Sequence, residues 1–199
     1  MPRIKYDDFV KTLRKADFFS FKIVESRMGR GYAKVFISNL LKKGEIIELK
    51  KGWYSFKKSP YLLVNLLVKA YLGLGSAALV HGAWDKAVNI TILTPLAGLS
   101  VRCGERLIGD YKVIVRRISN KMYFGYEYIA VDENFVKVSD PEKTLIDMIY
   151  FNYPFIDEIS GNLLQICDRE KIEEYLLTMD RAGVKGVKQI KRRIEELIT

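Results

Sequence analysis

The sequence predicts an α+β protein in which an N-terminal winged helix-turn-helix domain, residues 1–59, precedes a mixed α+β domain, residues 60–199. Three observations support this division. Three helical patterns and a β-hairpin pattern follow one another within the first 60 residues. All of the excess positive charge lies in the same segment, and Ser59-Pro60 separates it from a second apolar stretch.

The charge is distributed very unevenly along the chain. The 199 residues include 33 Lys or Arg and 24 Asp or Glu, which gives a formal net charge of +9. Residues 1–59 hold 15 of the basic and 6 of the acidic residues, whereas residues 60–199 hold 18 of each. A charge excess confined to one segment is typical of a domain that binds a polyanion. A lysine-rich, solvated surface is the alternative interpretation.

The composition excludes several classes of protein. A hydrophobic fraction of 49% fits a folded core rather than a disordered chain. Two cysteines are too few for a disulfide framework or a four-thiolate zinc site. Residues 61–72, the most apolar run, are interrupted by Asn65 and Lys69 and are too short to span a bilayer. Because no signal-peptide pattern opens the sequence, we expect a cytoplasmic protein with no membrane partner.

Helical patterns dominate the first 43 residues. A first helix is expected over residues 6–15, where Phe9 and Leu13 are four residues apart among charged ones. Ser20 is a suitable N-cap for a second helix over residues 21–28. Gly29 and Gly31 then allow a turn. A third helix is expected over residues 32–43, with an apolar face formed by Ala33, Phe36, Ile37, Leu40 and Leu41.

A hairpin pattern follows the three helices. Two β-rich runs, residues 45–49 and 53–56, flank the turn sequence Lys50-Lys51-Gly52. Three helices followed by a hairpin is the order of elements in a winged helix-turn-helix. In that fold the third helix buries one face against the first two and presents the other to the DNA major groove.

The outward face of the third helix and the tip of the wing supply the candidate DNA contacts. We expect Lys34, Ser38 and Asn39 to face bases, and Lys50 and Lys51 to face the phosphate backbone. The alternative is an ordinary core helix with a solvated lysine face. The full set of candidates is Arg30, Tyr32, Lys34, Ser38, Asn39, Lys42, Lys50 and Lys51.

Residues 60–199 predict a small mixed sheet packed by helices. Helices are expected at 61–71, at 77–82 with Ser76 as cap, from 141 onward, at 168–177 and at 185–198. Strands are expected at 89–94, 110–118, 123–131 and 135–138. The sequence Ser139-Asp140-Pro141-Glu142 matches a capping box, in which Ser139 caps the helix and Glu142 bonds back to the cap.

Three ordered blocks of sequence resemble a known family. They are Leu40-Leu41-Lys42-Lys43-Gly44-Glu45-Ile46 with Lys51-Gly52-Trp53-Tyr54, Ser76-Ala77-Ala78-Leu79 with His81-Gly82, and Val138-Ser139-Asp140-Pro141-Glu142-Lys143-Thr144-Leu145-Ile146-Asp147. Over residues 5–150 the chain resembles the AbiEi family of antitoxins and transcriptional regulators, which belong to type IV abortive-infection toxin–antitoxin modules. Residues 155–199 match the family pattern poorly.

The resemblance implies two activities and two partners. The N-terminal domain of this family binds double-stranded operator DNA and represses its own operon. The C-terminal domain counteracts a nucleotidyltransferase-like toxin encoded beside it, and a stable complex with the toxin is not required. Asp147 resembles an acidic residue on a helix of the family. From the residues alone, we interpret Asp147 as a buried carboxylate paired with an arginine or a helix cap.

The sequence offers little catalytic chemistry. His81 is the only histidine, so we expect a hydrogen-bonded structural role for it and no two-histidine metal site or proton relay. Asp110 and Lys112 at the start of a strand, with Asp85, resemble part of a metal-dependent nuclease site, but their spacing is loose. No phosphate-binding glycine loop is present. We therefore predict no enzymatic activity, no metal and no cofactor.

Two further clusters leave alternatives open. Tyr123, Phe124, Tyr126 and Tyr128 could stack RNA bases, although cross-strand packing is the preferred interpretation. A basic cluster near the C-terminus forms either a solvated helix face or a secondary contact with nucleic acid or toxin. It comprises Arg181, Lys185, Lys188, Lys191, Arg192 and Arg193, partly balanced by Glu195 and Glu196. An RNA- or tRNA-binding protein and a metal-dependent nuclease thus remain as alternatives to a DNA-binding repressor and antitoxin.

Overall fold

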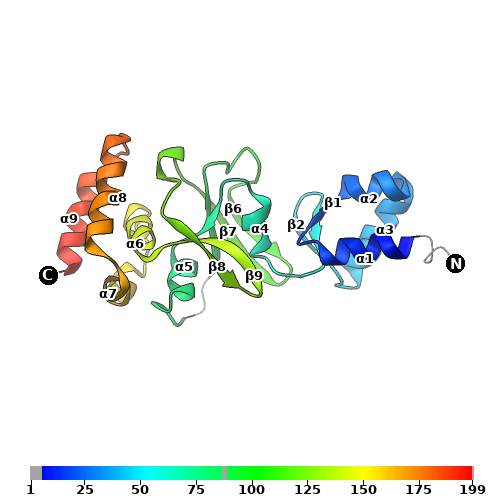
Figure 1. Ribbon diagram of the computed structural model, residues 1–199, viewed down its shortest axis with the longest axis horizontal. Helices are drawn as coiled ribbons and strands as arrows, with labels where there is room; N and C mark the ends of the chain where they lie inside the picture. Colours follow the sequence, from blue (N-terminus) through cyan, green and yellow to red (C-terminus); the bar gives the residue numbers. More distant parts are fainter. Residues whose placement is uncertain (1–5, 87–88, 199) are drawn as a thin grey trace.

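The structure, a computed structural model, describes residues 6–86 and 89–198. The molecule is elongated (Figure 1). The N-terminal helices and their small sheet form one end, a larger mixed sheet lies in the middle, and the C-terminal helices form the other end. The α+β fold class predicted from the sequence is confirmed.

The N-terminal segment has the arrangement of a winged helix-turn-helix. Its helices are α1 (Asp7–Lys15), α2 (Phe21–Met28) and α3 (Arg30–Lys42). Its strands β1 (Phe19–Ser20), β2 (Ile47–Lys50) and β3 (Trp53–Ser55) form an antiparallel sheet in the order β1-β3-β2. Strand β1 was not predicted, because two residues give no periodic pattern. Apolar side chains from all three helices form the core of this segment, among them Leu13, Val24, Ala33, Ile37 and Leu40.

Local signals fix the ends of α2 and α3. The Ser20 hydroxyl oxygen accepts a hydrogen bond from the backbone N–H of Ile23 at 3.3 Å, so the predicted cap is confirmed. The turn between α2 and α3 was expected to use both Gly29 and Gly31, but only Gly29 has a positive φ, of 78°. Gly31 is already helical, and α3 therefore begins at Arg30 rather than at Tyr32.

A six-stranded mixed sheet forms the middle of the molecule. Its strands are β4 (Tyr71–Leu72), β5 (Ile90–Thr94), β6 (Gly104–Ile108), β7 (Tyr111–Arg117), β8 (Tyr126–Val131) and β9 (Asn134–Ser139). They lie in the order β6-β7-β5-β4-β9-β8. The pairs β5–β7 and β4–β9 are parallel, and the other neighbouring pairs are antiparallel.

Several predicted elements of this part were wrong. The helix expected over residues 61–71 is only α4 (Leu62–Leu66), because Tyr71 and Leu72 form a central strand that pairs with β5 through both residues and with β9 through Leu72. The chain passes close to β5 there: a Cβ on Gly73 would lie 2.6 Å from a methyl carbon of Leu93. Strand β6 was missed. It lies at the edge of the sheet, where most of its side chains are exposed, so its sequence lacks the alternation of apolar and polar residues that marks a strand. The strand expected from residue 123 begins at Tyr126, after a short 3₁₀ helix, η2 (Asn120–Met122).

Helices cover the two faces of the sheet. Helices α5 (Gly75–Val80), α6 (Pro141–Tyr150), α7 (Ile156–Ile166), α8 (Arg169–Arg181) and α9 (Val187–Ile198) form one core with Tyr71 and Leu93. Helix α4 and the wing residue Leu49 form the other core with Leu72 and Ile92. Helix α7 was not predicted. Within the described ranges, no helix is long and apolar enough to cross a membrane.

The predicted caps of α5 and α6 were wrong. Helix α5 begins at Gly75, and the Ser76 hydroxyl oxygen instead accepts a hydrogen bond from the backbone N–H of Thr91 at 2.7 Å. Helix α6 is capped by Asp140, whose carboxylate accepts from the backbone N–H of Lys143 at 2.8 Å. Ser139 is the last residue of β9, and its hydroxyl donates to the carbonyl oxygen of Leu72. Ser76 therefore joins α5 to β5, and Ser139 joins β9 to β4, and neither serine caps a helix.

Candidate nucleic-acid interface

Helix α3 buries one side and exposes the other. Ala33, Ile37 and Leu40 are buried in the N-terminal core, whereas Val35, on the opposite side, is 57% exposed. Lys34, Ser38 and Lys42 are accessible and border a shallow groove of about 290 Å³ between α3, the start of α2 and β3. The sequence-predicted candidates on this side of the helix therefore share one accessible surface next to the wing.

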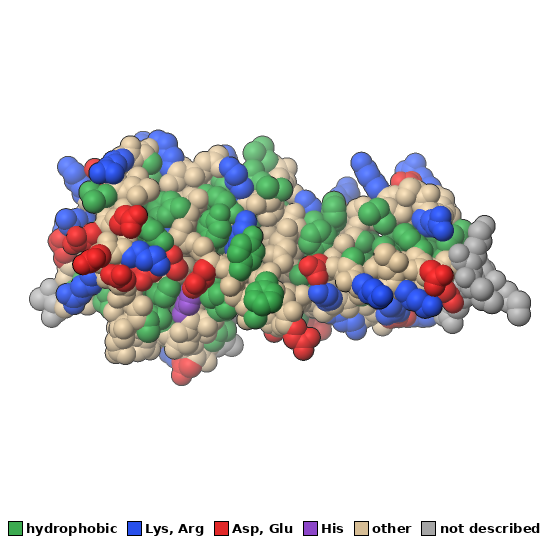
Figure 2. All heavy atoms as spheres, viewed as in Figure 1, with side chains coloured by type: hydrophobic (Ala, Val, Ile, Leu, Met, Phe, Trp, Pro, Cys, Tyr) green, Lys and Arg blue, Asp and Glu red, His purple; other side chains and the backbone are tan. Residues whose placement is uncertain are grey.

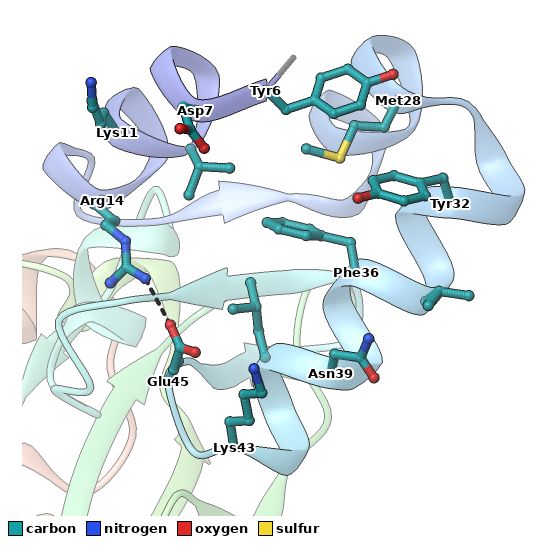
Figure 3. Close-up of a pocket in the computed structure, with 13 residues that line it drawn as sticks. Tyr6, Asp7, Lys11, Arg14, Met28, Tyr32, Phe36, Asn39, Lys43 and Glu45 are labelled. Atoms are coloured by element: carbon teal, nitrogen blue, oxygen red, sulfur yellow. Dashed lines mark hydrogen bonds and ion pairs between the residues drawn. The ribbon is translucent and has the colours of Figure 1, made fainter. Parts of the chain in front are cut away.

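Two other candidates lie on the α1 side of the same helix. Tyr32 and Asn39 line a cleft of about 590 Å³ between α1 and α3 (Figure 3). The Tyr32 ring lies 5.7 Å from the ring of Tyr6. The cleft is also bordered by the ion pair between Arg14 and Glu45, at 2.7 Å. The structure thus divides the predicted contact set between two sides of one exposed helix surface.

The first turn of α3 carries Arg30. Its guanidinium Nε lies 3.7 Å from a carboxylate oxygen of Glu25, and its side chain remains 76% exposed. Surface ion pairs of this kind are worth only about 0–1 kcal/mol. Arg30 can therefore exchange this carboxylate for a phosphate at little cost.

The two lysines of the wing lie in different environments. Lys51 is exposed at the turn, where Gly52 has φ of 75° and donates its N–H to the Glu48 carboxylate at 2.9 Å. Lys50 is partly buried, and its ammonium donates to the carbonyl oxygen of Ser100 at 3.4 Å. The pairing of β2 with β3 is shifted by a bulge between Glu48 and Lys50. Of these two lysines, Lys51 is therefore the one that points freely away from the protein.

The wing is supported by the central sheet. Leu49 is 1% exposed and belongs to the core that contains α4. A Cβ on Gly109, in the turn between β6 and β7, would lie 3.3 Å from Ile47. The Lys57 ammonium lies 2.5 Å from the Asp17 carboxylate and 3.4 Å from the Asn134 amide oxygen. These contacts fix the position of the wing relative to the rest of the molecule.

The sequence block around Ser139-Asp140-Pro141-Glu142 is buried rather than displayed. Tyr175 donates its hydroxyl to Asp140 at 2.6 Å, and Lys171 lies 2.9 Å from the Glu142 carboxylate. Glu142 also accepts the backbone N–H of Asp168 at 2.8 Å. These bonds join the start of α6 to the start of α8. Glu142 therefore does not return to the cap, as the predicted capping box required.

Asp147 is fully buried with a lysine, not with an arginine or a cap as expected. Its carboxylate forms an ion pair with Lys143 and accepts the Tyr71 hydroxyl at 2.8 Å. The Lys143 ammonium also donates to the Tyr71 oxygen at 2.9 Å. Burial lowers the pKa of Lys143 and raises the pKa of Asp147, and their mutual attraction opposes both shifts. This group joins α6 to the central strand β4 and offers no surface to a partner.

The residues considered for catalysis are dispersed in structural roles. His81 is hydrogen-bonded as expected, with Nε2 2.7 Å from the carbonyl oxygen of Ser139. Lys112 pairs with Glu105 across β6 and β7 at 2.8 Å, and Asp110 lies in the turn between these strands. Across residues 6–86 and 89–198, no group of three or more His, Cys, Asp and Glu side chains could hold a metal ion.

In both the aromatic cluster and the C-terminal basic cluster, some side chains are packed or paired within the protein and others are exposed. The rings of Tyr123 and Tyr126 pack together with their centres 5.0 Å apart, and the ring centre of Phe124 lies 5.1 Å from that of Tyr175. Tyr128, by contrast, is 63% exposed. In the basic cluster, Arg193 pairs with Asp157 and Glu196, and Arg192 pairs with Glu196. The lysines of that cluster are exposed.

Comparison with known proteins gives a fold and no more. No protein-family model and no curated protein matches the sequence. Among solved structures, the chain is similar to the crystal structure of the Rv2827c protein from Mycobacterium tuberculosis. The TM-score is 0.55, and the likeness covers 86% of this chain and 70% of that chain at 18% sequence identity.

Sequence reasoning missed two features of the candidate surfaces. It did not find the anchoring of Lys50 on Ser100, which joins residues 50 positions apart and leaves no local pattern. It also missed Phe135, which is 68% exposed on the same face of the β8–β9 hairpin as Tyr128. The two-residue turn between β8 and β9 could have revealed this neighbour, since it sets the register of the hairpin.

Proposed function

We propose that this protein is a transcriptional regulator that binds duplex DNA through α3 and the tip of the wing. The observation that carries the proposal is the accessible surface of α3. Lys34, Ser38 and Lys42 are accessible there, and among the described residues none of their side chains has a hydrogen-bond or ion-pair partner. The same segment holds the whole charge excess of the chain, with 15 basic and 6 acidic residues in positions 1–59.

Each class of side chain has a distinct task in this proposal. Lys42 and Lys51 neutralise phosphates, which releases counterions and makes the affinity fall steeply with salt. Lys34, Ser38 and Asn39 offer hydrogen bonds to base edges in the major groove, where a lysine can bind guanine and an asparagine can bind adenine through two bonds. Val35, in the middle of the exposed face, can contact a thymine methyl group.

Footprinting tests the proposal on the full-length chain. The probe is the DNA upstream of the chain's own gene, with a coding-region fragment of equal length as control. We expect protection of a discrete segment upstream, and loss of that protection when Lys34, Lys42 and Lys51 are all changed to alanine. Equal protection of both fragments, or protection that survives the triple change, would contradict the proposal.

The resemblance to the AbiEi family supports a finer proposal. In this proposal the regulator represses its own operon in the cytoplasm, and its C-terminal part counteracts a nucleotidyltransferase-like toxin encoded beside it. In this proposal the buried block from Ser139 to Asp147 stabilises the C-terminal part and does not contact the toxin, because its charged side chains form ion pairs and hydrogen bonds within the protein.

A growth-rescue assay separates the two activities. The neighbouring nucleotidyltransferase-like gene is expressed from an unrelated promoter, together with the wild-type chain or the triple lysine variant. We expect the variant to lose repression and to retain rescue. Loss of rescue by a folded and abundant variant would show that the two activities cannot be separated. Absence of such a neighbouring gene would remove the antitoxin part and leave the regulator.

A further inference from the structure

Strands β8 and β9 present an exposed aromatic pair on one face of the sheet. Asp132 and Glu133 form a two-residue turn, with φ of 46° and 61°, and so fix the register of the hairpin. Tyr128 then lies opposite Lys137, and Ala130 lies opposite Phe135, so that these side chains share one face. Tyr128 is 63% exposed and Phe135 is 68% exposed.

A cation lies within this aromatic surface. The Lys137 ammonium is 5.2 Å from the ring centre of Tyr126 and 5.8 Å from that of Tyr128, and it donates to the Tyr123 hydroxyl at 3.0 Å. The Tyr123 hydrogen bond and burial raise the pKa of Tyr126, and the charges of Lys137 and Lys69 oppose this rise. Figure 2 shows apolar and basic side chains together over β8 and β9.

The surface rests on a rigid support. Tyr126 stacks on Tyr71, with ring centres 5.9 Å apart and planes inclined by 20°. Tyr71 is itself fully buried and bonded to Asp147. Tyr126, at the base of the surface, is therefore held in place before a ligand binds, which lowers the entropic cost of binding there.

We propose that this face of β8 and β9 binds single-stranded nucleic acid, with bases stacked on Tyr128 and Phe135 and a phosphate at Lys137. Exposed rings on adjacent antiparallel strands match the way in which sheets stack unpaired bases. A duplex hides the faces of its bases and does not fit. A protein partner is less well matched, because lysine is depleted at the centre of protein interfaces.

Binding assays on the full-length chain test this site separately from the winged helix. The triple variant in which Lys34, Lys42 and Lys51 are alanine serves as background, so that the duplex-binding surface contributes little. Fluorescein-labelled RNA and DNA 12-mers of mixed sequence are the probes, and anisotropy is the readout. In this background, Tyr128→Ala and Phe135→Ala should each weaken binding by about 5- to 150-fold, the loss expected for one stacked base.

Tyr111→Ala is the matched control, since Tyr111 is an exposed tyrosine at the start of β7, in the other half of the sheet. It should change the affinity less than twofold. Tighter binding of RNA than of DNA would support the proposal with an added 2′-hydroxyl contact, and equal binding would support stacking and phosphate contacts alone.

Two results would overturn the proposal. One is an affinity for single strands that Tyr128→Ala and Phe135→Ala leave unchanged. The other is loss of toxin neutralisation in these two variants without loss of single-strand binding, which would make the surface a protein contact. The same variants in the otherwise wild-type chain should retain binding to the upstream duplex, so failure here is distinguishable from failure of the proposed repressor function.

Discussion

Two regions of the molecule, the surface of α3 with the wing tip and the buried contact between α6 and β4, use charged side chains in opposite ways. On α3 and the wing tip, Lys34, Lys42 and Lys51 point into solvent without partners among the described residues. In the C-terminal part, Lys143 and Asp147 are 0% exposed and satisfy each other. Outward, unpaired charge is available to a partner, whereas inward, paired charge holds the fold together. Mutations in the two sets should therefore have different readouts, binding for the first and stability for the second.

The largest effect is expected from the inward set. Asp147→Ala removes the carboxylate that neutralises Lys143 and accepts the Tyr71 hydroxyl, and leaves the lysine buried without a counter-charge. Removing one partner of a buried pair costs about 3–5 kcal/mol of unfolding free energy. Denaturation in guanidinium chloride, followed by circular dichroism, measures this loss.

Asp157→Ala provides the matched control for that experiment. Asp157 is also a helical aspartate paired with a cation, Arg193, but its side chain is 72% exposed. An exposed pair contributes only about 0–1 kcal/mol. Comparable losses in the two variants would show that burial does not decide how much an ion pair of this protein contributes to stability.

The second effect concerns the outward set and is measured by DNA binding. Each neutralised phosphate contributes roughly 0.9 to the slope of log affinity against log salt concentration. Changing Lys34, Lys42 and Lys51 together to alanine should therefore flatten the slope on the upstream duplex by roughly 0.9 for every phosphate that these lysines neutralise. The midpoint of unfolding should stay unchanged, because none of the three side chains is part of the core.

A variant with the same change in charge at the other end is the control. Lys185, Lys188 and Lys191 are exposed residues in and beside α9. Their joint replacement by alanine should leave the salt slope unaltered. If it flattens the slope as much, the net charge of the protein, and not the surface of α3, governs its attraction to DNA.

Sequence reasoning succeeded where a structural feature depends on close neighbours. The Ser20 cap and the apolar stripe of α3 depend on residues within one or two helical turns. It failed where distant strands decide the conformation. Tyr71 and Leu72 continue an apolar helical pattern, yet pairing with β5 and β9 makes them a strand. Ser139 has the residue type of a cap but completes β9, and Asp140 takes over the cap.

The candidate site shows the same limit. The helical period separates the exposed residues of α3 from its buried ones except at Leu41, which was expected on the apolar face and is 38% exposed. It cannot show that Tyr32 and Asn39 border the cleft with α1 while Lys34 and Ser38 border the groove beside the wing, because these neighbours come from other elements. Nor can it show that one wing lysine is anchored on a loop of the central sheet.

A smaller effect, on specificity, is expected from Asn39. If its amide binds a base through two hydrogen bonds, Asn39→Ala should cost about 1–3 kcal/mol on the specific site and nearly nothing on unrelated DNA. Competition between the upstream fragment and a shuffled fragment of equal composition measures the ratio. An equal loss on both fragments, with the fold intact, would place Asn39 outside the group that reads sequence.

The smallest effect separates the two lysines of the wing. The sequence predicts equal phosphate contacts from both, but the Lys50 ammonium already donates to the Ser100 carbonyl oxygen, whereas Lys51 is exposed at the turn. Lys51→Ala should therefore lower the salt slope by roughly 0.9, and Lys50→Ala should leave it unchanged. Both variants lose one positive charge at adjacent positions of the wing, so long-range attraction to DNA is matched between them. An equal reduction of the slope would mean that Lys50 leaves Ser100 when DNA binds, and that the wing gives up this hydrogen bond to the central domain in the complex.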